Sequence, residues 1–269
     1  MSIQSVIESL KASESIHTRD AFLHRCRIEL EPFVYSYLND TYGPTLSSHW
    51  SSCTIPLEST KGIVIVERRC HPNLKFTIQN AVYFAPGYSL HIVCSEANRE
   101  FVEEICGSQV SSVHIHSVFK DIGTPESGKK EYNMLLKSYG FWSFFPEEWL
   151  LCMETDSYLL DKLPEEIYNY NYVASKWHWV PGQAGGGGLS HRKKSFMLEI
   201  CSIDSLNAEM QDCFASEGLA LLGHPVMEGE IFGETSCDYR TLGTHQWWTF
   251  SCDSEPLEDY LSLLLTLRI

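Results

Sequence analysis

Two carboxylates separated by one residue follow a short apolar run, and their types and spacing suit metal or diphosphate chemistry. The run covers residues 149–153, and Glu154 and Asp156 come directly after it. Because side chains at positions i and i+2 of an extended chain point to the same side, both carboxylates can face one ligand. Hard oxygen ligands of this kind suit Mg²⁺ or Mn²⁺, which commonly bridge a carboxylate to a diphosphate. The alternative is a solvated turn in which Asp156 and Ser157 cap a following helix.

The segments before this pair alternate between strand-like and helix-like patterns. Apolar or β-branched runs predict strands at residues 62–66, 89–94 and 113–118. Helical spacing of apolar residues predicts helices at residues 75–83, 96–105 and 132–142. Ser95 is expected to cap the second helix, and residues 121–130 are expected to form a polar loop. This order predicts an α/β fold with a mostly parallel sheet and right-handed crossovers. Ligands of such sheets bind at the carboxyl ends of the strands, where the acidic pair would lie.

The second half of the chain contains an aromatic strand pattern and a run of glycines. A helix-like stretch follows Ser157, residues 170–174 predict a strand, and glycines occupy positions 185–188. The glycine run does not have the spacing of a dinucleotide-binding turn or a P-loop. It is either a flexible turn or a loop that lets a ligand approach the backbone closely. Further helices are expected at residues 195–203, 209–222 and 256–267.

The N-terminal part has helical spacing but no polar constellation. Residues 1–50 are predicted to be helical, except that residues 39–52, which are rich in Gly, Pro and Ser, are expected to form a linker. We therefore expect a helical N-terminal extension over residues 1–52, whose role is packing, and a main domain over residues 60–269.

Composition excludes several classes of protein. The chain has 269 residues and a formal net charge of −15, which argues against a sequence-independent nucleic-acid binder and against an anionic membrane surface as partner. None of its ten cysteines forms a C-x-x-C pair, and the sequence leads us to expect neither a secretory leader nor a membrane-spanning run. A reduced, cytoplasmic protein without a membrane span is expected. A nucleotide ligand stays compatible with the charge, because a metal ion and a few basic side chains neutralise it locally.

With these residues laid out, the chain resembles a little-characterised family of GT-A-like glycosyltransferases known from giant algal viruses and protists. The matching segments come in the family's order: Val64–Pro72 with its Glu/Arg turn, Glu131–Trp142, the D-x-D variant Glu154–Ser157, Tyr172–Trp177, Gly185–Arg192 and the G-x-H-x-x-W segment Gly243–Trp248. The chain departs from the family pattern at Ser175-Lys176, where the family has Ala-Pro, and at Gly186, where it has Asn. The family's E-D-x-x-F stretch has only an approximate counterpart at Gln211–Phe214. The resemblance implies a GT-A-type, Rossmann-like fold over residues 60–250.

The resemblance also implies a donor site for a nucleotide-diphosphate sugar. Asp156 and His245 would hold Mn²⁺ or Mg²⁺ on the diphosphate, with Glu154 as a ligand or in the second shell. Glu67 and Arg69 would contact the nucleoside, with Asn98 nearby. A UDP-sugar is the usual donor of metal-dependent enzymes of this kind, and xylose is one candidate sugar. If the protein is viral, the host cytoplasm is its expected location.

On the acceptor side, the resemblance implies that residues 185–188, which we call the glycine segment, and their neighbours bind a glycan. The residues concerned are Gly186, Gly187, Gly188, Ser190 and Arg192. Stacking on a sugar face is expected from Trp177, Trp179 or Trp247. The base that deprotonates the acceptor hydroxyl is expected to be Asp212, or Glu209 about one helical turn earlier. A base opposite the leaving group implies inversion at the anomeric carbon, whereas retention is expected if no carboxylate lies near that hydroxyl.

Two other functions are compatible with the sequence. A non-catalytic glycan- or nucleotide-binding module would also use many aromatic residues, and the chain has 13 Tyr, 13 Phe and 7 Trp. A metal-dependent phosphoesterase would place two ions on the acidic pair, but it needs more His and Asp ligands than the sequence places near Glu154 and Asp156. His114 and His116 share one face of a predicted strand, and a structural role is expected for them.

Overall fold

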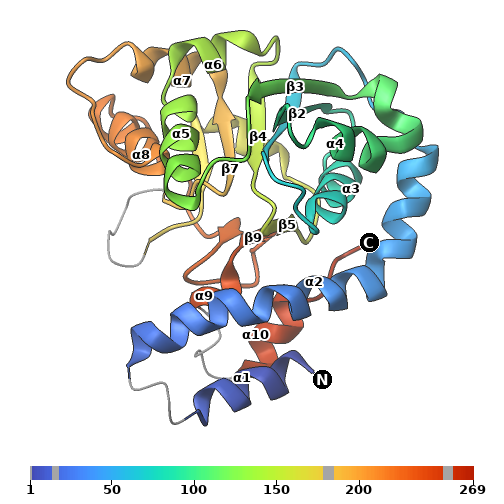
Figure 1. Cartoon of the computed structure of the whole chain (residues 1–269). Coiled ribbons are helices and arrows are strands. Elements are labelled where there is room, and N and C mark those ends of the chain that lie inside the picture. The colour runs from blue at the N-terminus through green and yellow to red at the C-terminus, as the bar shows by residue number, and fades with distance from the viewer. Residues whose placement is uncertain (1, 14–17, 178–184, 251–256) are drawn as a thin grey trace.

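A six-stranded sheet carries the acidic pair at the carboxyl ends of its parallel strands. The computed structural model describes residues 2–13, 18–177, 185–250 and 257–269. The sheet has the order β3-β2-β1-β4-β7-β6 (Figure 1). Its strands are β1 (Lys61–Val66), β2 (Ser89–Ser95), β3 (His114–Phe119), β4 (Trp149–Met153), β6 (Tyr172–Ala174) and β7 (Leu189–Lys193). The first four strands are parallel to one another, and β7 is antiparallel to both β4 and β6. The predicted α/β fold with a mostly parallel sheet is confirmed.

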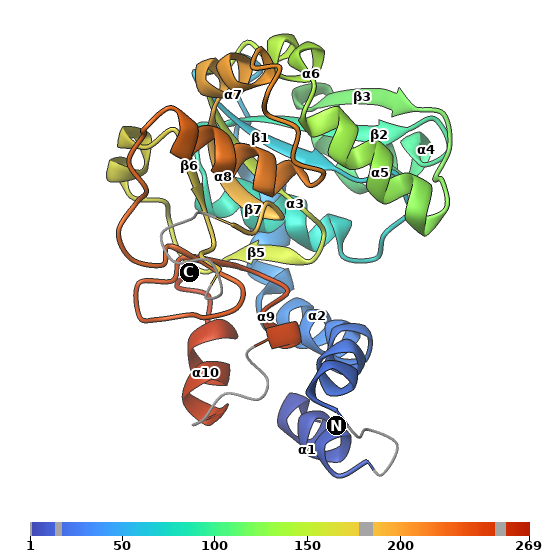
Figure 2. The same ribbon diagram turned by 90° about the vertical axis from the view of Figure 1, so that its left-hand side faces the viewer.

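Helices cover both faces of this sheet because the side chains of its buried strands alternate between two cores. Ile63 and Ile65 of β1 pack in one core with α3 (Leu74–Phe84) and α4 (Arg99–Cys106). Val64, between them, packs in the other core. The helices of that second face are α5 (Pro125–Leu136), α6 (Tyr139–Phe144), α7 (Lys194–Cys201) and α8 (Gln211–Leu221). Figure 2 shows α5 and α8 in front of the sheet. Two short 3₁₀ helices, η1 (Gly107–Ser112) and η2 (Glu165–Asn169), complete the connections.

A small second sheet adjoins the acidic pair. It has the order β5-β9-β8, with β5 (Ser157–Leu159) antiparallel to β9 (Gly243–His245) and β8 (Phe232–Gly233) parallel to β9. The prediction of a helix after Ser157 is therefore wrong at its start, where the chain forms β5. The three residues of β5 are all buried, and Tyr158 donates a hydrogen bond to the carbonyl of Leu264 at 2.6 Å. Burial of every side chain favours a paired strand over an amphipathic helix here.

The N-terminal part consists of α1 (Ile3–Lys11) and the long helix α2 (Arg19–Ser52). The linker expected at residues 39–52 is wrong, because α2 continues through Gly43 and Pro44. Leu46 and Trp50, in its last turns, are buried in the same core as β1, so tertiary packing outweighs the unfavourable helix propensity of glycine and proline. The same helix contacts α3 and α9 (Trp247–Phe250), and α10 (Leu257–Leu264) follows (Figure 1). None of the described helices is long and apolar enough to cross a membrane.

Local capping shifts several predicted helix boundaries. Helix α4 begins three residues later than expected, because the backbone N–H of Asn98 donates to Ser95 Oγ at 3.1 Å and that of Ser95 donates to Asn98 Oδ1 at 2.8 Å. The loop expected at residues 121–130 contains the first turns of α5, which Thr124 caps. The helix expected at residues 132–142 is split in two, because Ser138 accepts a hydrogen bond from the backbone N–H of Phe141 and starts α6.

A buried imidazole in β7 makes the stability of the fold dependent on pH. His191 is fully buried and stacks on Trp149, and burial, with a smaller effect of Lys61, lowers its pKa to about 3. The unfolded chain takes up this proton near pH 6.5, so stability falls as the pH drops from about 6.5 toward 3. We expect His191→Phe to remove about 2 kcal/mol of the destabilisation seen between pH 8 and pH 5. Urea unfolding at both pH values measures it. Replacing the exposed His24 by Gln is the control, and an unchanged pH dependence in His191→Phe would contradict the prediction.

Candidate metal centre

The turn between β4 and β5 presents Glu154 and Asp156, and we call Glu154–Asp156 the acid corner. The backbone N–H and the hydroxyl of Ser157 donate to the carbonyl of Glu154 at 3.1 and 2.7 Å, which closes the turn. The N–H of Glu154 donates to the carbonyl of Gly188 at 2.8 Å and ties the corner to the glycine segment. The chain then enters a strand, so the alternative in which Asp156 and Ser157 cap a helix is wrong.

Strand pairing brings His245 to the acid corner. His245 is the last residue of β9 and lies opposite Ser157 in the antiparallel ladder. Its Nε2 lies 3.3 Å from Asp156 Oδ1 and 3.8 Å from Glu154 Oε2. One ligand atom from each of the three residues lies within 4.8 Å of the others. The predicted ligands Glu154, Asp156 and His245 therefore come together in space.

The sequence analysis missed a fourth residue of this centre, Glu234. It directly follows β8, the parallel neighbour of β9, so Glu234 and His245 leave the same edge of the small sheet. Glu234 Oε1 lies 3.2 Å from His245 Nδ1, and its Oε2 accepts a hydrogen bond from Ser175 Oγ at 2.9 Å. The imidazole thus has the acid corner at one ring nitrogen and Glu234 at the other. Carboxylate, histidine and metal occur in this order in many metal sites.

The charges of the centre depend on one another. Burial disfavours the charged imidazole, but the carboxylates of Asp156 and Glu234 outweigh it and raise the pKa of His245 well above its usual value. Burial and the charge of Asp156 raise the pKa of Glu154. Burial opposes ionisation of Asp156, yet the charge of His245 holds its pKa below the usual range. Three carboxylates thus share one imidazole, and this excess of negative charge favours a divalent cation.

The residues fit a small divalent cation in three further respects. Asp156 Oδ1 and His245 Nε2 are buried, and neither has a hydrogen-bond partner among the described residues. A Cβ atom at Gly188 would collide with the ring of His245, so the backbone can pack against the imidazole only because this residue is glycine. Neighbouring ligands of an octahedral ion with bonds of about 2.1 Å lie about 3 Å apart, close to the 3.3 Å between Asp156 and His245. Two carboxylates and one imidazole suit Mn²⁺ or Mg²⁺.

A strained residue holds Asp156 in place. Gln246 has a φ of 45°, which non-glycine residues rarely adopt, and it directly follows His245. Its side-chain amide donates to Asp156 Oδ2, and its backbone N–H donates to the carbonyl of Asp156 at 3.0 Å. These bonds leave Oδ1 as the oxygen that faces His245. Backbone strain of this kind persists where the surrounding structure fixes it, often at functional sites.

Glu67 and Arg69, predicted to bind the nucleoside, lie beside the acid corner in the turn that follows β1, and Asn98 lies next to this turn at the start of α4. Glu67 is buried and accepts hydrogen bonds from Thr155 Oγ1 at 3.0 Å and from Arg69 Nη2 at 2.7 Å. Arg69 is 59% exposed, so its guanidinium is anchored by Glu67 and accessible to a ligand. Asn98 is fully buried, and its amide bonds Ser95 and the carbonyls of Glu67 and Arg69. This favours a role for Asn98 in holding the turn over the expected nucleoside contact.

The glycine segment is packed against the protein's own side chains. A Cβ atom would collide with Trp177 at Gly185, with Ser175 and Glu234 at Gly186, with Gln211 at Gly187 and with His245 at Gly188. Gly186 also has a φ of 53°, which favours glycine. The close contacts that require these glycines are therefore made by the protein's own side chains, among them Glu234 and His245 of the centre. Contact of Gly186, Gly187 and Gly188 with an acceptor stays a prediction.

Ser190 and Arg192 hold the glycine segment by hydrogen bonds to the carbonyl of Gly187. Arg192 is fully buried and donates from Nε to Ser190 Oγ at 2.8 Å and from Nη2 to the carbonyl of Gly187 at 3.4 Å. Its guanidinium lies over the rings of Trp142 and Tyr172. These contacts favour a role in shaping the glycine segment over direct contact with an acceptor.

The predicted tryptophans have different environments. Trp247 is fully buried, and its Nε1 donates to Tyr158 Oη at 2.7 Å, so the expectation that it stacks on a sugar is wrong. Trp177 is half-buried against Gly185, at the edge of the centre. Stacking by Trp177 stays a prediction, and Trp179 lies outside the described residues.

The two candidate bases are now distinguishable. Asp212, in the first turn of α8, is partly buried, and its Oδ2 accepts from the N–H of Gly187 at 3.5 Å. Its charge also adds to the raised pKa of Glu154, which places it on the side of the acid corner. Glu209 is exposed and precedes α8, which begins at Gln211. The expectation that Glu209 lies one helical turn before Asp212 is wrong.

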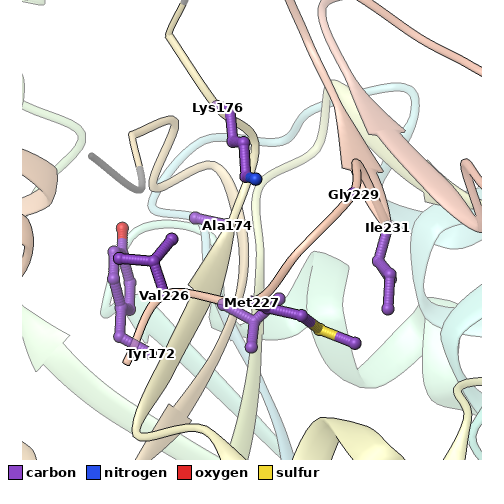
Figure 3. A pocket seen from close by; sticks show the side chains of 8 residues that line it. Tyr172, Ala174, Lys176, Val226, Met227, Gly229 and Ile231 are labelled. Atoms are coloured by element: carbon purple, nitrogen blue, oxygen red, sulfur yellow. The ribbon is translucent and has the colours of Figure 1, made fainter. Parts of the chain in front are cut away.

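A shallow pocket beside β6 does not serve as the substrate site. Figure 3 shows its lining, with Tyr172, Ala174 and Lys176 on β6 and its continuation and Val226, Met227, Gly229 and Ile231 on the segment that leads to β8. Its volume of about 10 Å³ holds roughly one water molecule. A nucleotide sugar is far larger than this volume.

Replacing Glu234 by alanine should weaken Mn²⁺ binding. Loss of an outer carboxylate that orients a metal-ligating histidine typically costs 10- to 100-fold in metal affinity, so the dissociation constant of Mn²⁺ should rise by about that factor. Isothermal titration calorimetry measures it, with Glu230→Ala on the same segment as the matched control. Unchanged Mn²⁺ affinity in Glu234→Ala, together with loss of binding in His245→Ala, would show that Glu234 does not act through the imidazole.

The model of one protein family matches residues 116–256, just over half of the chain. The family is described as "Protein of unknown function (DUF5672)". The matched segment contains the acid corner, the glycine segment, Glu234 and His245, and it leaves out α1, α2 and β1. No curated protein matches the chain.

Proposed function

Because the chain belongs to the DUF5672 family, whose description names no activity, we propose a function from the centre itself: a metal-dependent glycosyltransferase. The enzyme would move a sugar from a nucleotide-diphosphate sugar to a hydroxyl of a glycan. The observation that carries this proposal is the meeting of Glu154, Asp156 and His245 at the carboxyl edge of a mostly parallel sheet. Ligands of such sheets bind at this edge.

The identification of the fold as GT-A-type belongs to the same proposal. Two features support it: the acid-x-acid turn directly follows the central strand β4, and β7, which follows the glycine segment, pairs with β4 in the antiparallel direction. A cytoplasmic location is likewise part of the proposal.

On the donor side, Glu154, Asp156 and His245 would hold Mn²⁺ or Mg²⁺. When bound, the ion supplies Lewis-acid stabilisation of the leaving nucleotide diphosphate. Glu234 orients the imidazole of His245, and Gln246 orients the carboxylate of Asp156. Arg69, held by Glu67, adds a positive charge at the rim for the diphosphate or the nucleoside. A UDP-sugar is the favoured donor, with xylose as one candidate sugar.

On the acceptor side, Asp212 is the base of the proposed reaction. The acceptor oxygen forms a bond to the anomeric carbon, the bond from that carbon to the diphosphate oxygen breaks, and the acceptor proton passes to Asp212. The glycine segment carries the N–H that holds Asp212 Oδ2, so base and donor site are built on the same backbone. Trp177 offers a ring for stacking beside Gly185. A base in this place favours inversion at the anomeric carbon.

The phosphoesterase alternative receives no support from the described residues. Two ions need additional ligands, whereas Glu154, Asp156 and His245 are the one group of three or more metal-ligating side chains found within the described ranges. The binding-module alternative differs from the proposal in turnover alone, and the experiment below separates the two.

A screen of nucleotide sugars for hydrolysis tests the proposed function. With Mn²⁺ present, we expect release of the nucleotide from one donor, most readily a UDP-sugar, loss of activity with EDTA and its return with added Mn²⁺. Tight binding of a nucleotide sugar without hydrolysis or transfer would instead indicate a binding module. Hydrolysis that EDTA leaves unchanged would contradict the metal-dependent mechanism.

A further inference from the structure

One face of α2 lies directly beneath the metal centre. Tyr35 is buried and donates to the carbonyl of Ser157, the residue after Asp156, at 3.3 Å. Trp248, three residues after His245, donates from Nε1 to the carbonyl of Arg27 at 3.4 Å. These two contacts are eight residues apart on α2, so they fix one face of the helix against both sides of the centre. In Figure 1, α2 runs below β5, β9 and α9.

Glu31 lies on this face, between the two contacts. It is one helical turn after Arg27 and one turn before Tyr35, so all three residues lie in one row along the helix. The row runs from the segment after His245 to the segment after Asp156. Glu31 therefore lies on the face of α2 that packs against the segments carrying the centre, although α2 lies outside the segment that matches the family.

Glu31 is also bonded to the turn that carries Arg69. Its Oε1 accepts a hydrogen bond from Asn73 Nδ2 at 2.7 Å and lies 3.7 Å from His71 Nε2. The side chain keeps 27% of its surface exposed, and among the described residues its Oε2 has no hydrogen-bond partner. Burial and, next, the charge of Asp156 raise the pKa of Glu31 to about 7, in agreement with a position close to the acid corner.

The chemistry around Glu31 restricts what its free oxygen can bind. A phosphate is repelled by Glu31 and by the neighbouring Asp156, and the cation and Arg69 already provide for the diphosphate. Hydroxyl groups are neutral donors, and a carboxylate oxygen accepts strong hydrogen bonds from them. A nucleotide sugar carries vicinal hydroxyls on both sides of its diphosphate, on the ribose and on the sugar that is transferred.

We propose that Glu31 is a donor-binding residue whose Oε2 accepts hydrogen bonds from a vicinal diol of the nucleotide sugar. The N-terminal helix α2 is then a wall of the donor site, in addition to its packing role. Asn73 and His71 hold the other oxygen of Glu31, so the carboxylate is oriented before the donor binds. This inference rests on the proposed function, and it adds the residue that selects the hydroxylated part of the donor.

Nucleotide binding by the full-length chain in the presence of Mn²⁺ tests the inference. Calorimetry compares wild type with Glu31→Ala for three ligands: UDP, 2′,3′-dideoxy-UDP and a UDP-sugar, or the guanosine series if UDP does not bind. Loss of a hydrogen bond to a charged group should raise the dissociation constant by about 10- to 100-fold. If the ribose supplies the diol, UDP binds more weakly to Glu31→Ala and dideoxy-UDP binds equally to both proteins. If the transferred sugar supplies it, the UDP-sugar alone is affected.

Two further variants make the result independent of folding. Glu29→Ala removes a carboxylate two residues away on α2 that pairs with Arg25, and it should bind all three ligands like wild type. Glu31→Gln keeps an acceptor for Asn73 while losing the charge, and it should fall between wild type and Glu31→Ala. Equal binding of all three ligands by wild type and Glu31→Ala, with UDP bound tightly, would overturn this inference and leave the proposed function standing. A wild-type protein that binds no nucleotide with Mn²⁺ would overturn both.

Discussion

Asp156→Ala is expected to lower donor hydrolysis at least a thousand-fold and to remove Mn²⁺ binding. Asp156 is the carboxylate nearest to Nε2 of His245, at 3.3 Å from Oδ1, and without it this nitrogen keeps only Glu154 at 3.8 Å. Lewis-acid stabilisation of a leaving group is worth several kcal/mol, and about 1.4 kcal/mol corresponds to a factor of ten in rate. The measurement is the rate of nucleotide release at saturating Mn²⁺, together with a Mn²⁺ titration.

Two variants control for damage to the fold. Asp156→Asn keeps an oxygen that can accept from Gln246, so it should fold like wild type and still lose most Mn²⁺ affinity. Asp204→Ala removes an exposed carboxylate from the loop after α7 and should change neither quantity. If wild type and Asp156→Ala hydrolyse the donor equally, with and without EDTA, Asp156 is not a metal ligand of this reaction.

Asp212→Asn is expected to lower kcat for sugar transfer by about 10²- to 10⁴-fold and to leave donor binding within about two-fold of wild type. Asparagine is nearly the same size as aspartate, and its oxygen can still accept from the N–H of Gly187 or Cys213. It cannot take the proton of the acceptor hydroxyl. Single-turnover transfer and donor titration measured on the same preparations separate the chemical step from binding.

Glu209→Gln is the matched control for the base. Glu209 is exposed, lies before α8 and uses its carbonyl to accept from Lys137 Nζ at 2.8 Å, so its side chain should be dispensable for transfer. If Asp212→Asn weakens donor binding as much as it slows transfer, Asp212 supports the structure of the glycine segment and is not the base. Loss of transfer in Glu209→Gln alone would exchange the two assignments.

Local signals in the sequence are sufficient for the four parallel strands and for the acidic pair, but not for β7, which the sequence analysis did not predict. The β-branched run of β1 and the apolar run of β4 identify buried parallel strands without reference to the rest of the chain. The shared side of Glu154 and Asp156 is predicted from extended backbone. The two residues instead lie in a turn that the N–H of Ser157 closes on the carbonyl of Glu154, so the stated reason is wrong although both side chains face His245. His245 could be connected to them only through the family resemblance, because its approach depends on pairing between β5 and β9.

The parts that the sequence does not reveal depend on tertiary contacts. Glu234 follows a strand of two residues, which is too short to show any periodicity. The sequence favours stacking of the Trp247 indole on a sugar. In the structure the ring is buried in the core, and its N–H donates to Tyr158. Helix α2 passes through Gly43 and Pro44 because Leu46 and Trp50 are buried beyond them. Glu31 meets the turn after β1 only because α2 packs against it.

Pulsed electron paramagnetic resonance of bound Mn²⁺, with UDP added, tests the central claim most directly, because it identifies the ligand atoms of the ion. We expect one Mn²⁺ coupled to an imidazole nitrogen and to diphosphate phosphorus. The nitrogen coupling should disappear in His245→Ala, and binding should be lost in Asp156→Ala. Mn²⁺ that shows phosphorus coupling in UDP-containing samples but no protein nitrogen, with spectra identical in wild type and His245→Ala, would contradict the claim that the acid corner and His245 hold the cation.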